Sequence, residues 1–187
     1  MAVRPTFSQE ISNLLYASHG HPLAVCMQCG LCSASCPVVD HMDNSPRRLI
    51  AMIHADLKDD VLKSTTFWYC ASCYHCTVRC PRGINIAEMM YGLKRYSMWR
   101  NRYDKSLIGP DFSERFAKMI IKTGRSWEPA LAPSFIFKGG VQGFLYETQT
   151  ALKLMQRGRI PMTPSKIKRI KGFRRMLGRI IPLAGVK

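Results

Sequence analysis

Apolar residues along the chain recur mainly at helical spacing, and the alternation of apolar and polar residues that predicts strands is hard to find. Ser8 is expected to cap a short first helix. Ser45 and Pro46 match an N-cap and a first helical residue before the stretch RRLIAMIHADL. Asn85, with Glu88 three residues later, resembles a capping box that opens a longer helix. The pattern therefore predicts an all-α fold.

Similar signals divide the second half of the chain. Asp111 is a candidate cap for the helix FSERFAKMIIKT, and Gly124 is expected to end that helix. A Pro- and Gly-rich stretch then precedes two further predicted helices. We therefore expect a helical domain over residues 1–127 and a helical extension over residues 128–187.

Basic residues are concentrated in that extension. The chain of 187 residues has 28 Lys and Arg against 12 Asp and Glu, yet residues 148–187 contain 11 basic groups and no acidic one. The predicted helix at 165–180 places Ile167, Ile170 and Phe173 on one stripe, with its basic residues largely elsewhere. Such a helix is expected to dock on a partner protein or to lie on an anionic membrane, and docking is the favoured interpretation. Binding to nucleic acid is not expected.

Composition excludes several classes of protein. A hydrophobic content of 47% with 21% charged residues is typical of a globular protein, and no run of 18 apolar residues is present. The first residues lack the apolar stretch of a secretory signal. We therefore predict a cytoplasmic protein, in which cysteines bind metal more often than they form disulfides.

All eight cysteines fall into two copies of one motif. Each copy reads C-x2-C-x2-C-x3-C-P, and each cysteine recurs 44 positions later in the chain. The first copy contains Cys26, Cys29, Cys32 and Cys36, and the second contains Cys70, Cys73, Cys76 and Cys80. The spacing indicates an internal duplication of a metal-binding motif.

This motif is typical of two [4Fe-4S] clusters. A cubane has four irons that each need one thiolate, and three cysteines in a tight loop can surround one face of it. In the two-cluster bacterial pattern, the fourth cysteine of each motif ligates the other cluster. We therefore predict one cluster on Cys26, Cys29, Cys32 and Cys80, and the other on Cys70, Cys73, Cys76 and Cys36.

Two structural zinc sites are the alternative interpretation, because four cysteines also satisfy tetrahedral Zn²⁺. Zinc ribbons usually pair two C-x2-C units, so three cysteines at this spacing followed by Cys-Pro favour iron–sulfur clusters. His75 is expected not to be a ligand, because the cysteines already complete the set. Arg79 and Arg82, beside Cys80, are candidates to tune a cluster potential.

The two motifs are separated by 33 residues that have a helical pattern, which differs from the short connection of small bacterial ferredoxins. Over about residues 20–100 the chain resembles the α-helical ferredoxin family, and in particular the C subunit of heterodisulfide reductase and its relatives. The same domain occurs in iron–sulfur subunits of succinate dehydrogenase, fumarate reductase and glycolate oxidase.

The resemblance implies an electron conduit within a larger complex. In the family, the C subunit bridges a flavoprotein subunit and a subunit with cysteine-rich CCG motifs, where a disulfide is reduced or formed. This chain has no CCG repeat, no G-x-G-x-x-G motif and no spare cysteine, so we expect it to transfer electrons without a catalytic residue of its own. Both a methanogenesis type and a sulfur-oxidation type of complex are compatible with the motifs. The remaining alternatives are an iron–sulfur subunit of a succinate, fumarate or glycolate dehydrogenase and a zinc-stabilised protein that binds nucleic acid.

Overall fold

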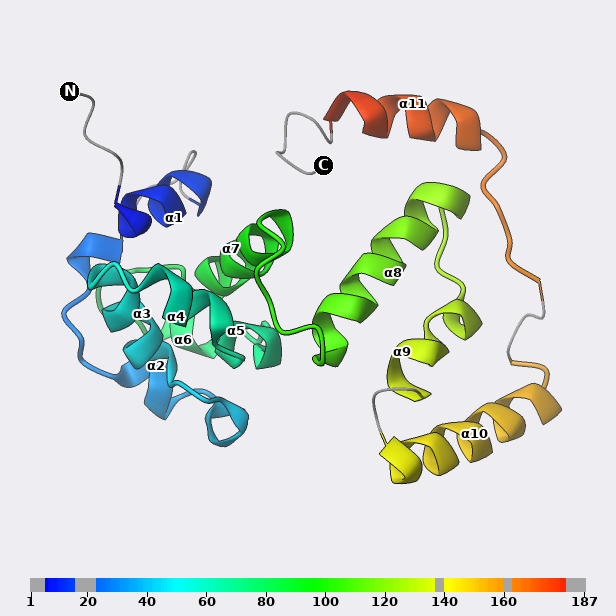
Figure 1. Cartoon of the computed structure of the whole chain (residues 1–187), viewed down its shortest axis with the longest axis horizontal. Helices are drawn as coiled ribbons and strands as arrows, with labels where there is room; N and C mark the ends of the chain where they lie inside the picture. Colours follow the sequence, from blue (N-terminus) through cyan, green and yellow to red (C-terminus); the bar gives the residue numbers. More distant parts are fainter. Residues whose placement is uncertain (1–5, 16–22, 137–139, 160–162, 181–187) are drawn as a thin grey trace. The chain divides into compact units, whose positions relative to one another are not determined.

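The computed structural model describes residues 6–15, 23–136, 140–159 and 163–180 (Figure 1). The chain divides into two compact units, Met1–Tyr103 and Asp104–Lys187. Every regular element in the described ranges is a helix, which confirms the predicted all-α fold. The domain boundary predicted at residue 127 falls within the second unit.

The first unit is built from short helices that follow one another closely. In chain order they are α1 (Phe7–Leu15), η1 (Leu23–Val25), α2 (Leu31–Ala34), η2 (Val39–His41), α3 (Pro46–His54), α4 (Lys58–Lys63), α5 (Thr66–Tyr69), α6 (His75–Val78) and α7 (Ile86–Trp99).

Two predicted helix starts in this unit are confirmed by their caps. The Ser45 hydroxyl accepts a hydrogen bond from the Arg48 amide at 3.4 Å, and α3 begins at Pro46. The Asn85 side chain accepts one from the Glu88 amide at 3.3 Å, and α7 begins at the next residue. Both caps satisfy an amide that has no partner within its own helix.

The predicted cap at Ser8 is wrong, because α1 already begins at Phe7. Thr6 and Gln9 form a reciprocal pair instead. The Gln9 amide donates to the Thr6 hydroxyl at 3.3 Å, and the Thr6 amide donates to the Gln9 side chain at 3.0 Å. This capping box satisfies two free amides, which a cap at Ser8 would leave without partners.

The core of the first unit lies between α1, α3, α5 and α7. Ile53 of α3, Phe67 of α5 and Leu93 of α7 are fully buried. Helix α1 contacts both α3 and α7, and α5 contacts α7. Full burial of a side chain of this size contributes roughly 1.5–3 kcal/mol, so these residues hold the scaffold that carries the two cysteine motifs.

The second unit contains α8 (Ile108–Thr123), η3 (Glu128–Ala130), α9 (Ala132–Ile136), α10 (Gly140–Gln156) and α11 (Ile170–Ile180). Helix α9 packs against both α8 and α10, and α11 packs against α8. Among the described helices, none is long and apolar enough to span a membrane.

The ends of α8 show one correct and one wrong prediction. Gly124 ends the helix with a left-handed φ of 74° and donates its amide to the Ile120 carbonyl at 2.8 Å, as predicted. The cap predicted at Asp111 is wrong, because the helix begins three residues earlier at Ile108. Asp111 lies in the first turn and pairs with Arg115 at 2.8 Å, one turn further along.

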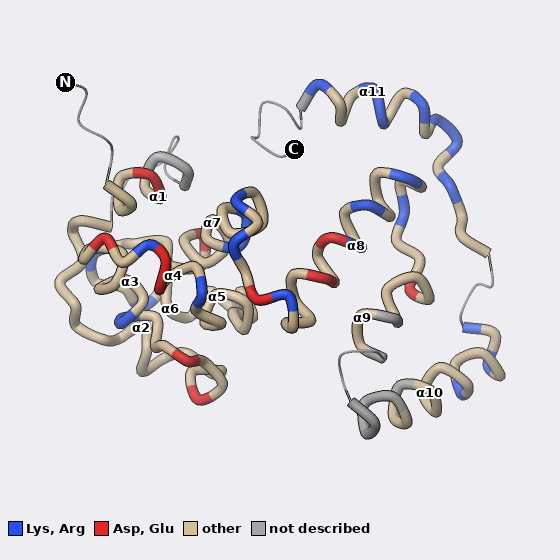
Figure 2. The backbone as a smooth tube through the Cα atoms, in the orientation of Figure 1, with Lys and Arg blue, Asp and Glu red and all other residues tan. Residues whose placement is uncertain are grey.

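Charge is distributed unevenly over the second unit. The described part of α11 carries Lys and Arg but no Asp or Glu, whereas α8 carries both signs (Figure 2). Part of the basic charge that the sequence places in the tail is thus carried by a helix that packs against α8.

Candidate metal centre

The two cysteine loops have the same backbone geometry. In the first loop Gln28 and Gly30 have positive φ angles of 58° and 84°, and in the second loop Ser72 and Tyr74, 44 positions later, have φ angles of 54° and 61°. Left-handed residues in such turns direct successive backbone N–H groups to one side, which creates a concavity that binds anions such as iron–sulfur clusters. The duplication seen in the sequence is therefore also a duplication of the backbone.

Each loop leads into a single helical turn with the same hydrogen bonds. The Ser33 amide donates to the Gly30 carbonyl at 2.9 Å at the start of α2, and the Thr77 amide donates to the Tyr74 carbonyl at 3.0 Å at the start of α6. Helices α2 and α6 contact each other. Their ends therefore carry the fourth cysteine of each motif across toward the loop of the other motif.

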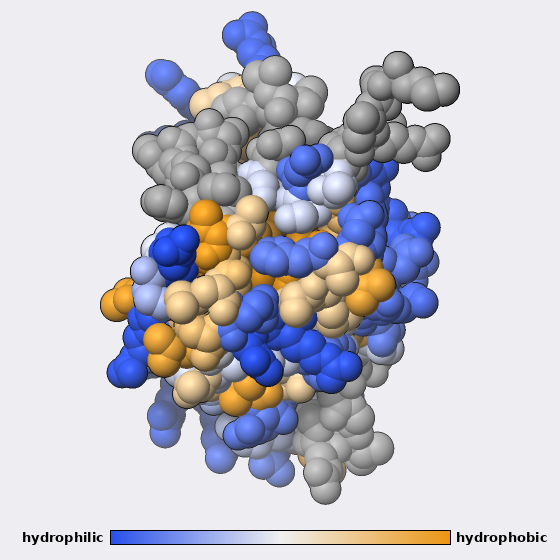
Figure 3. Space-filling model, turned by 90° about the vertical axis from the view of Figure 1, so that its left-hand side faces the viewer, coloured by the Kyte–Doolittle hydropathy of each residue, from blue (hydrophilic) through white to orange (hydrophobic). Residues whose placement is uncertain are grey.

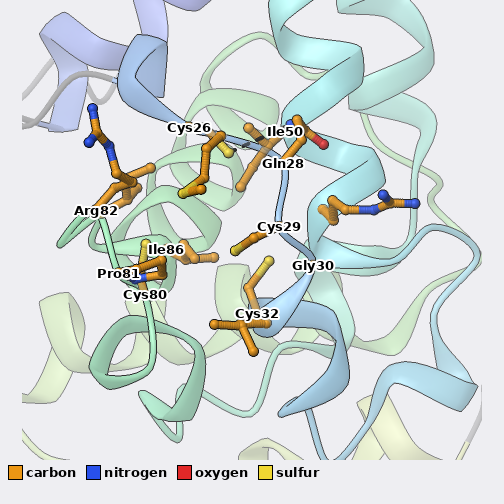
Figure 4. Close-up of a pocket in the computed structure, with 14 residues that line it drawn as sticks. Cys26, Gln28, Cys29, Gly30, Cys32, Ile50, Cys80, Pro81, Arg82 and Ile86 are labelled. Atoms are coloured by element: carbon orange, nitrogen blue, oxygen red, sulfur yellow. Dashed lines mark hydrogen bonds between the residues drawn. The ribbon is translucent and has the colours of Figure 1, made fainter.

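The first cavity has a volume of about 350 Å³ and lies in the first loop. Cys26, Cys29 and Cys32 line it together with Cys80, which comes from the second motif (Figure 4). The Gln28 amide group lies 3.6 Å from the Cys26 sulfur and donates a hydrogen bond to it. The remaining lining residues are Met27, Gln28, Gly30, Leu31, Arg47, Ile50, Pro81, Arg82, Ile84 and Ile86.

The second cavity, of about 370 Å³, is built in the reciprocal way. Cys70, Cys73 and Cys76 of the second motif line it together with Cys36 of the first. Its other lining residues are Val38, Met42, Pro46, Ala71, Ser72, Tyr74, Ala87 and Met90. The structure thus brings together the same two groups of four cysteines that the sequence pattern predicts.

The cysteines differ in their exposure to solvent. Cys32 is buried, whereas Cys29 and Cys73, the second cysteine of each motif, are exposed at the rims of their cavities. Burial raises the pKa of the Cys32, Cys36 and Cys76 thiols. Because a metal ligates the thiolate, metal binding at these cysteines must release protons.

The residues present fit a cubane in each cavity. None of the eight cysteines forms a disulfide. Within the described residues, no three His, Cys, Asp or Glu side chains are placed to hold one metal ion. Each quartet of thiols surrounds a cavity instead, and a [4Fe-4S] cluster needs one thiolate at each of four separated corners. The cavities and their donor sets therefore fit two [4Fe-4S] clusters.

Other residues singled out in the sequence lie around this centre. His75 is exposed at the start of α6 and lines neither cavity. Arg82 lines the first cavity, whereas Arg79 is exposed and lines neither.

Sequence reasoning missed Asp43, which joins the two motifs. Its carboxylate accepts hydrogen bonds from the Ser64 hydroxyl at 2.8 Å and from the Thr66 amide and hydroxyl at 3.0 and 2.7 Å. Partial burial opposes ionisation, but these donors and Thr65 lower the pKa of Asp43 to about 2. The connection after Cys36 is thereby tied to the segment that leads into Cys70. Asp43 offers no signal in the sequence, because its partners are distant along the chain.

Comparison with known proteins agrees with this geometry. The family model of a 4Fe-4S dicluster domain matches residues 22–84, which contain both motifs. The C subunit of the ferredoxin:CoB-CoM heterodisulfide reductase of Methanosarcina mazei is 31% identical over 119 residues, which are 64% of this chain and 69% of that protein. This chain belongs to the family of heterodisulfide reductase C subunits.

Other members of this family match over a similar stretch. The C subunit of the H(2):CoB-CoM heterodisulfide,ferredoxin reductase of Methanothermobacter marburgensis is 31% identical over 116 residues, 62% of this chain and 60% of that protein. The iron-sulfur C subunit of the CoB–CoM heterodisulfide reductase of Methanopyrus kandleri is 30% identical over 128 residues, 66% of this chain and 64% of that protein. The chain therefore spans somewhat less than two thirds of the length of these two relatives.

Proposed function

We propose that the chain relays single electrons between two partner subunits of a heterodisulfide reductase-like complex. The observation that carries this proposal is the pair of four-cysteine cavities within one small helical unit. Each [4Fe-4S] cluster, when bound, supplies one-electron redox chemistry. The protein contributes the cysteine ligands, the backbone concavities and an apolar wall. Cys29 and Cys73 at the two rims give each cavity its own exposed edge, as a relay with two partners requires.

The proposed ligand sets are crossed between the motifs. Cys80 completes the set of the first motif and Cys36 completes that of the second, as the lining of the two cavities supports. Paired serine variants test this assignment by electron paramagnetic resonance of the anaerobically purified protein. Cys80→Ser and Cys29→Ser should change one and the same cluster signal, and Cys36→Ser and Cys73→Ser should change the other. If Cys80→Ser and Cys73→Ser instead change the same signal, the ligands are not crossed.

The proposed partners are a flavoprotein subunit and a CCG-type subunit that handles a disulfide, in a reaction of the methanogenesis or the sulfur-oxidation type. Both partners are implied by the family and supported by the composition of the chain, whose eight cysteines are all used in the two cavities. Anaerobic affinity purification with identification of the co-purifying subunits tests the proposal. Recovery of about eight irons per chain, four for each cluster, is expected together with both partners. Stoichiometric zinc without acid-labile sulfide would contradict it.

We also propose that α11 contacts an anionic membrane surface mainly by its charge, because the apolar stripe predicted to dock on a partner packs against α8. Its apolar residues Phe173 and Leu177 are half-buried in the second unit, where α11 packs against α8, and Arg174 donates to the Lys122 carbonyl at 2.7 Å. The side left exposed carries Lys171, Arg175 and Arg179 together with Met176. Flotation with vesicles tests this contact. Binding should require anionic lipid, weaken with salt and fall when Arg175 and Arg179 are both changed to Gln. Equal binding to neutral vesicles would contradict it.

A further inference from the structure

The duplication makes the two cavities directly comparable, because a residue of one loop has an equivalent 44 positions away. Arg82 follows Cys80 and Pro81 and lines the first cavity, whereas the equivalent Val38 follows Cys36 and Pro37 and lines the second. Gln28 lines the first cavity and its equivalent Ser72 lines the second. The backbone is the same in both loops, so the cavities differ in their side chains. Besides these two pairs, Met27 and Gly30 of the first cavity correspond to Ala71 and Tyr74 of the second.

Arg82 is held at the first cavity by the chain itself. Its Nε donates to the Val25 carbonyl at 3.2 Å, directly before Cys26. Figure 4 shows Arg82 with Cys80 and Pro81 on the segment of chain that closes the cavity opposite Gly30. The positive charge of Arg82 is therefore fixed near one cluster position and not shared between the two.

Arg47 adds a second positive charge to the same cavity. Its amide donates to the Ser33 hydroxyl at 3.0 Å, which joins the start of α3 to α2. Its side chain runs past Gly30, where an added Cβ would lie 3.5 Å from the Arg47 Cδ. That distance is an ordinary van der Waals contact, so the Arg47 side chain packs directly on the first loop.

None of the described residues that line the second cavity carries a formal charge apart from the cysteine ligands. The first cavity, by contrast, is lined by Arg47, Arg82 and Gln28, and the Gln28 amide donates a hydrogen bond to the Cys26 sulfur. The Arg82 guanidinium is directed away from the sulfur atoms (Figure 4), so its charge acts on the cavity from the margin. Reduction adds a negative charge, which positive groups and donors to sulfur stabilise, so they raise the reduction potential. The second cavity has one cation close by, since the Lys94 ammonium donates to the Cys70 carbonyl at 3.2 Å. Against this one cation, the first cavity has Arg47, Arg82 and the Gln28 donor, so the remaining electrostatic difference still favours reduction at the first cavity.

We propose that Arg47, Arg82 and Gln28 make the first cavity the high-potential end of the relay, so that electrons enter through the second cavity and leave through the first. This inference rests on the proposed electron-transfer function. It assigns the exposed rim at Cys29 to the electron acceptor and the exposed rim at Cys73 to the electron donor. The acceptor is expected to present acidic groups to the positive rim of the first cavity.

An anaerobic redox titration of the full chain, followed by electron paramagnetic resonance, tests the proposal. The signal lost in Cys80→Ser marks the first cavity, and it should have the higher potential in the wild type. Arg82→Val, which copies the second cavity, should lower that potential selectively. In the double variant with Arg82→Val and Arg47→Gln, the ratio of reduced to oxidised first cluster at a fixed ambient potential should fall about tenfold. This corresponds to a decrease of about 59 mV in the potential of a one-electron couple.

Two further variants give a gain-of-function test and a matched control. Val38→Arg should raise the potential of the second cavity and narrow the gap between the two clusters. Arg79→Gln removes an exposed arginine that lines neither cavity, so its effect should be much smaller than that of Arg82→Val. Since Arg47 and Arg82 are exposed, the gap should also shrink with added salt.

The outcomes separate this inference from the proposed function. A first cavity with the lower potential, or Arg82→Val lowering both potentials equally, overturns the direction of flow but leaves a two-cluster protein intact. A chain that binds no iron would refute the proposed function itself. If the Arg82→Val protein lost a cluster, the Val38→Arg and Arg47→Gln variants would still test the effect of positive charge on the potentials, because neither of them changes a cysteine ligand.

Discussion

Replacing Asp43 with Asn should destabilise the first unit, because this one carboxylate joins the two halves of the duplication. It accepts hydrogen bonds from Ser64 and Thr66, both of which are buried. Thr66 begins α5, the helix directly before Cys70. Asn keeps one acceptor oxygen in the same place but loses the charge that strengthens these bonds. The substitution therefore isolates the electrostatic part of the connection.

The size of the effect follows from the pKa of Asp43. A decrease from 3.8 to about 2 corresponds to roughly 2.4 kcal/mol of stabilisation by the ionised group. Asp43 is more than one third exposed, so solvent screening reduces this contribution to about 1 kcal/mol. Because the pKa is lower in the folded state, the contribution is complete above the unfolded value of 3.8 and is lost as the pH falls toward 2.

Urea unfolding of the cluster-loaded protein under anaerobic conditions measures the effect, with helix content followed by circular dichroism. Asp43→Asn should lower the free energy of unfolding by about 1 kcal/mol at about pH 7 and by the same amount at about pH 5, where Asp43 is still ionised. Asp40→Asn is the matched control, because this exposed carboxylate makes no hydrogen bond to any residue that the structure describes. It should change stability by less than about 0.5 kcal/mol.

Two results would refute this reasoning. If Asp43→Asn is as stable as the wild type at neutral pH, the hydrogen bonds of the carboxylate carry no net energy. If the difference from the wild type disappears on mild acidification to the lower pH of the assay, the relevant group titrates well above the pKa of about 2.

Three further substitutions have expected outcomes that the same unfolding assay checks. Tyr74→Gly should stabilise the fold by up to about 1 kcal/mol, because Tyr74 has a left-handed φ of 61°, which glycine adopts without strain. A loss of stability would show that packing of the Tyr74 ring outweighs this strain. Tyr96→Phe should cost about 1 kcal/mol by removing the hydroxyl that donates to Glu10 at 2.6 Å, and it should leave the cluster signals unchanged. Arg174→Gln should release α11 from the carbonyl oxygens at the end of α8, where it donates to the Ile121 carbonyl at 3.2 Å, and should increase proteolysis in the second unit only.

Features that depend on neighbours in sequence could be predicted from the sequence. The caps at Ser45 and Asn85 and the end of α8 at Gly124 each act on amides or carbonyls within a few residues, so the signal and its effect lie in one short stretch. The start of the first helix has a local signal of the same kind. Thr6 is followed by Gln9 three residues later, which is the spacing of a capping box, whereas Ser8 is followed at that spacing by Ile11, so the sequence favours Thr6 over Ser8 as the cap.

Features that depend on contacts between distant segments could not be predicted in the same way. The spacing of the cysteines predicts the two quartets, but nothing in the spacing indicates that Arg47 of α3 lies beside Gly30. That approach requires α3 to pack on α2, which the hydrogen bond from the Arg47 amide to Ser33 helps to fix. The buried partners of Asp43, Ser64 and Thr66, could not be predicted for the same reason, because they are distant from it along the chain.

The repeated backbone also bears on how two cavities with identical ligands can hold clusters of different reduction potential. Around Cys29 and Cys73 the φ angles and helical hydrogen bonds agree, so ligand geometry gives little means of separating two potentials. The side chains are free to differ, because the position after each Cys-Pro lies on the cavity wall but takes no part in ligation. Arg82 and Val38 occupy these equivalent positions. Patches of hydrophobic residues lie between hydrophilic ones on the face seen in Figure 3. Met27 in the first cysteine loop and Val78 at the end of α6 are 62% and 82% exposed. A substitution at Arg82 or Val38 alters the potential of one cluster, and a substitution at Met27 or Val78 alters a surface, without changing a cysteine ligand. The two copies of a duplicated motif can therefore acquire different potentials through residues that do not bind iron.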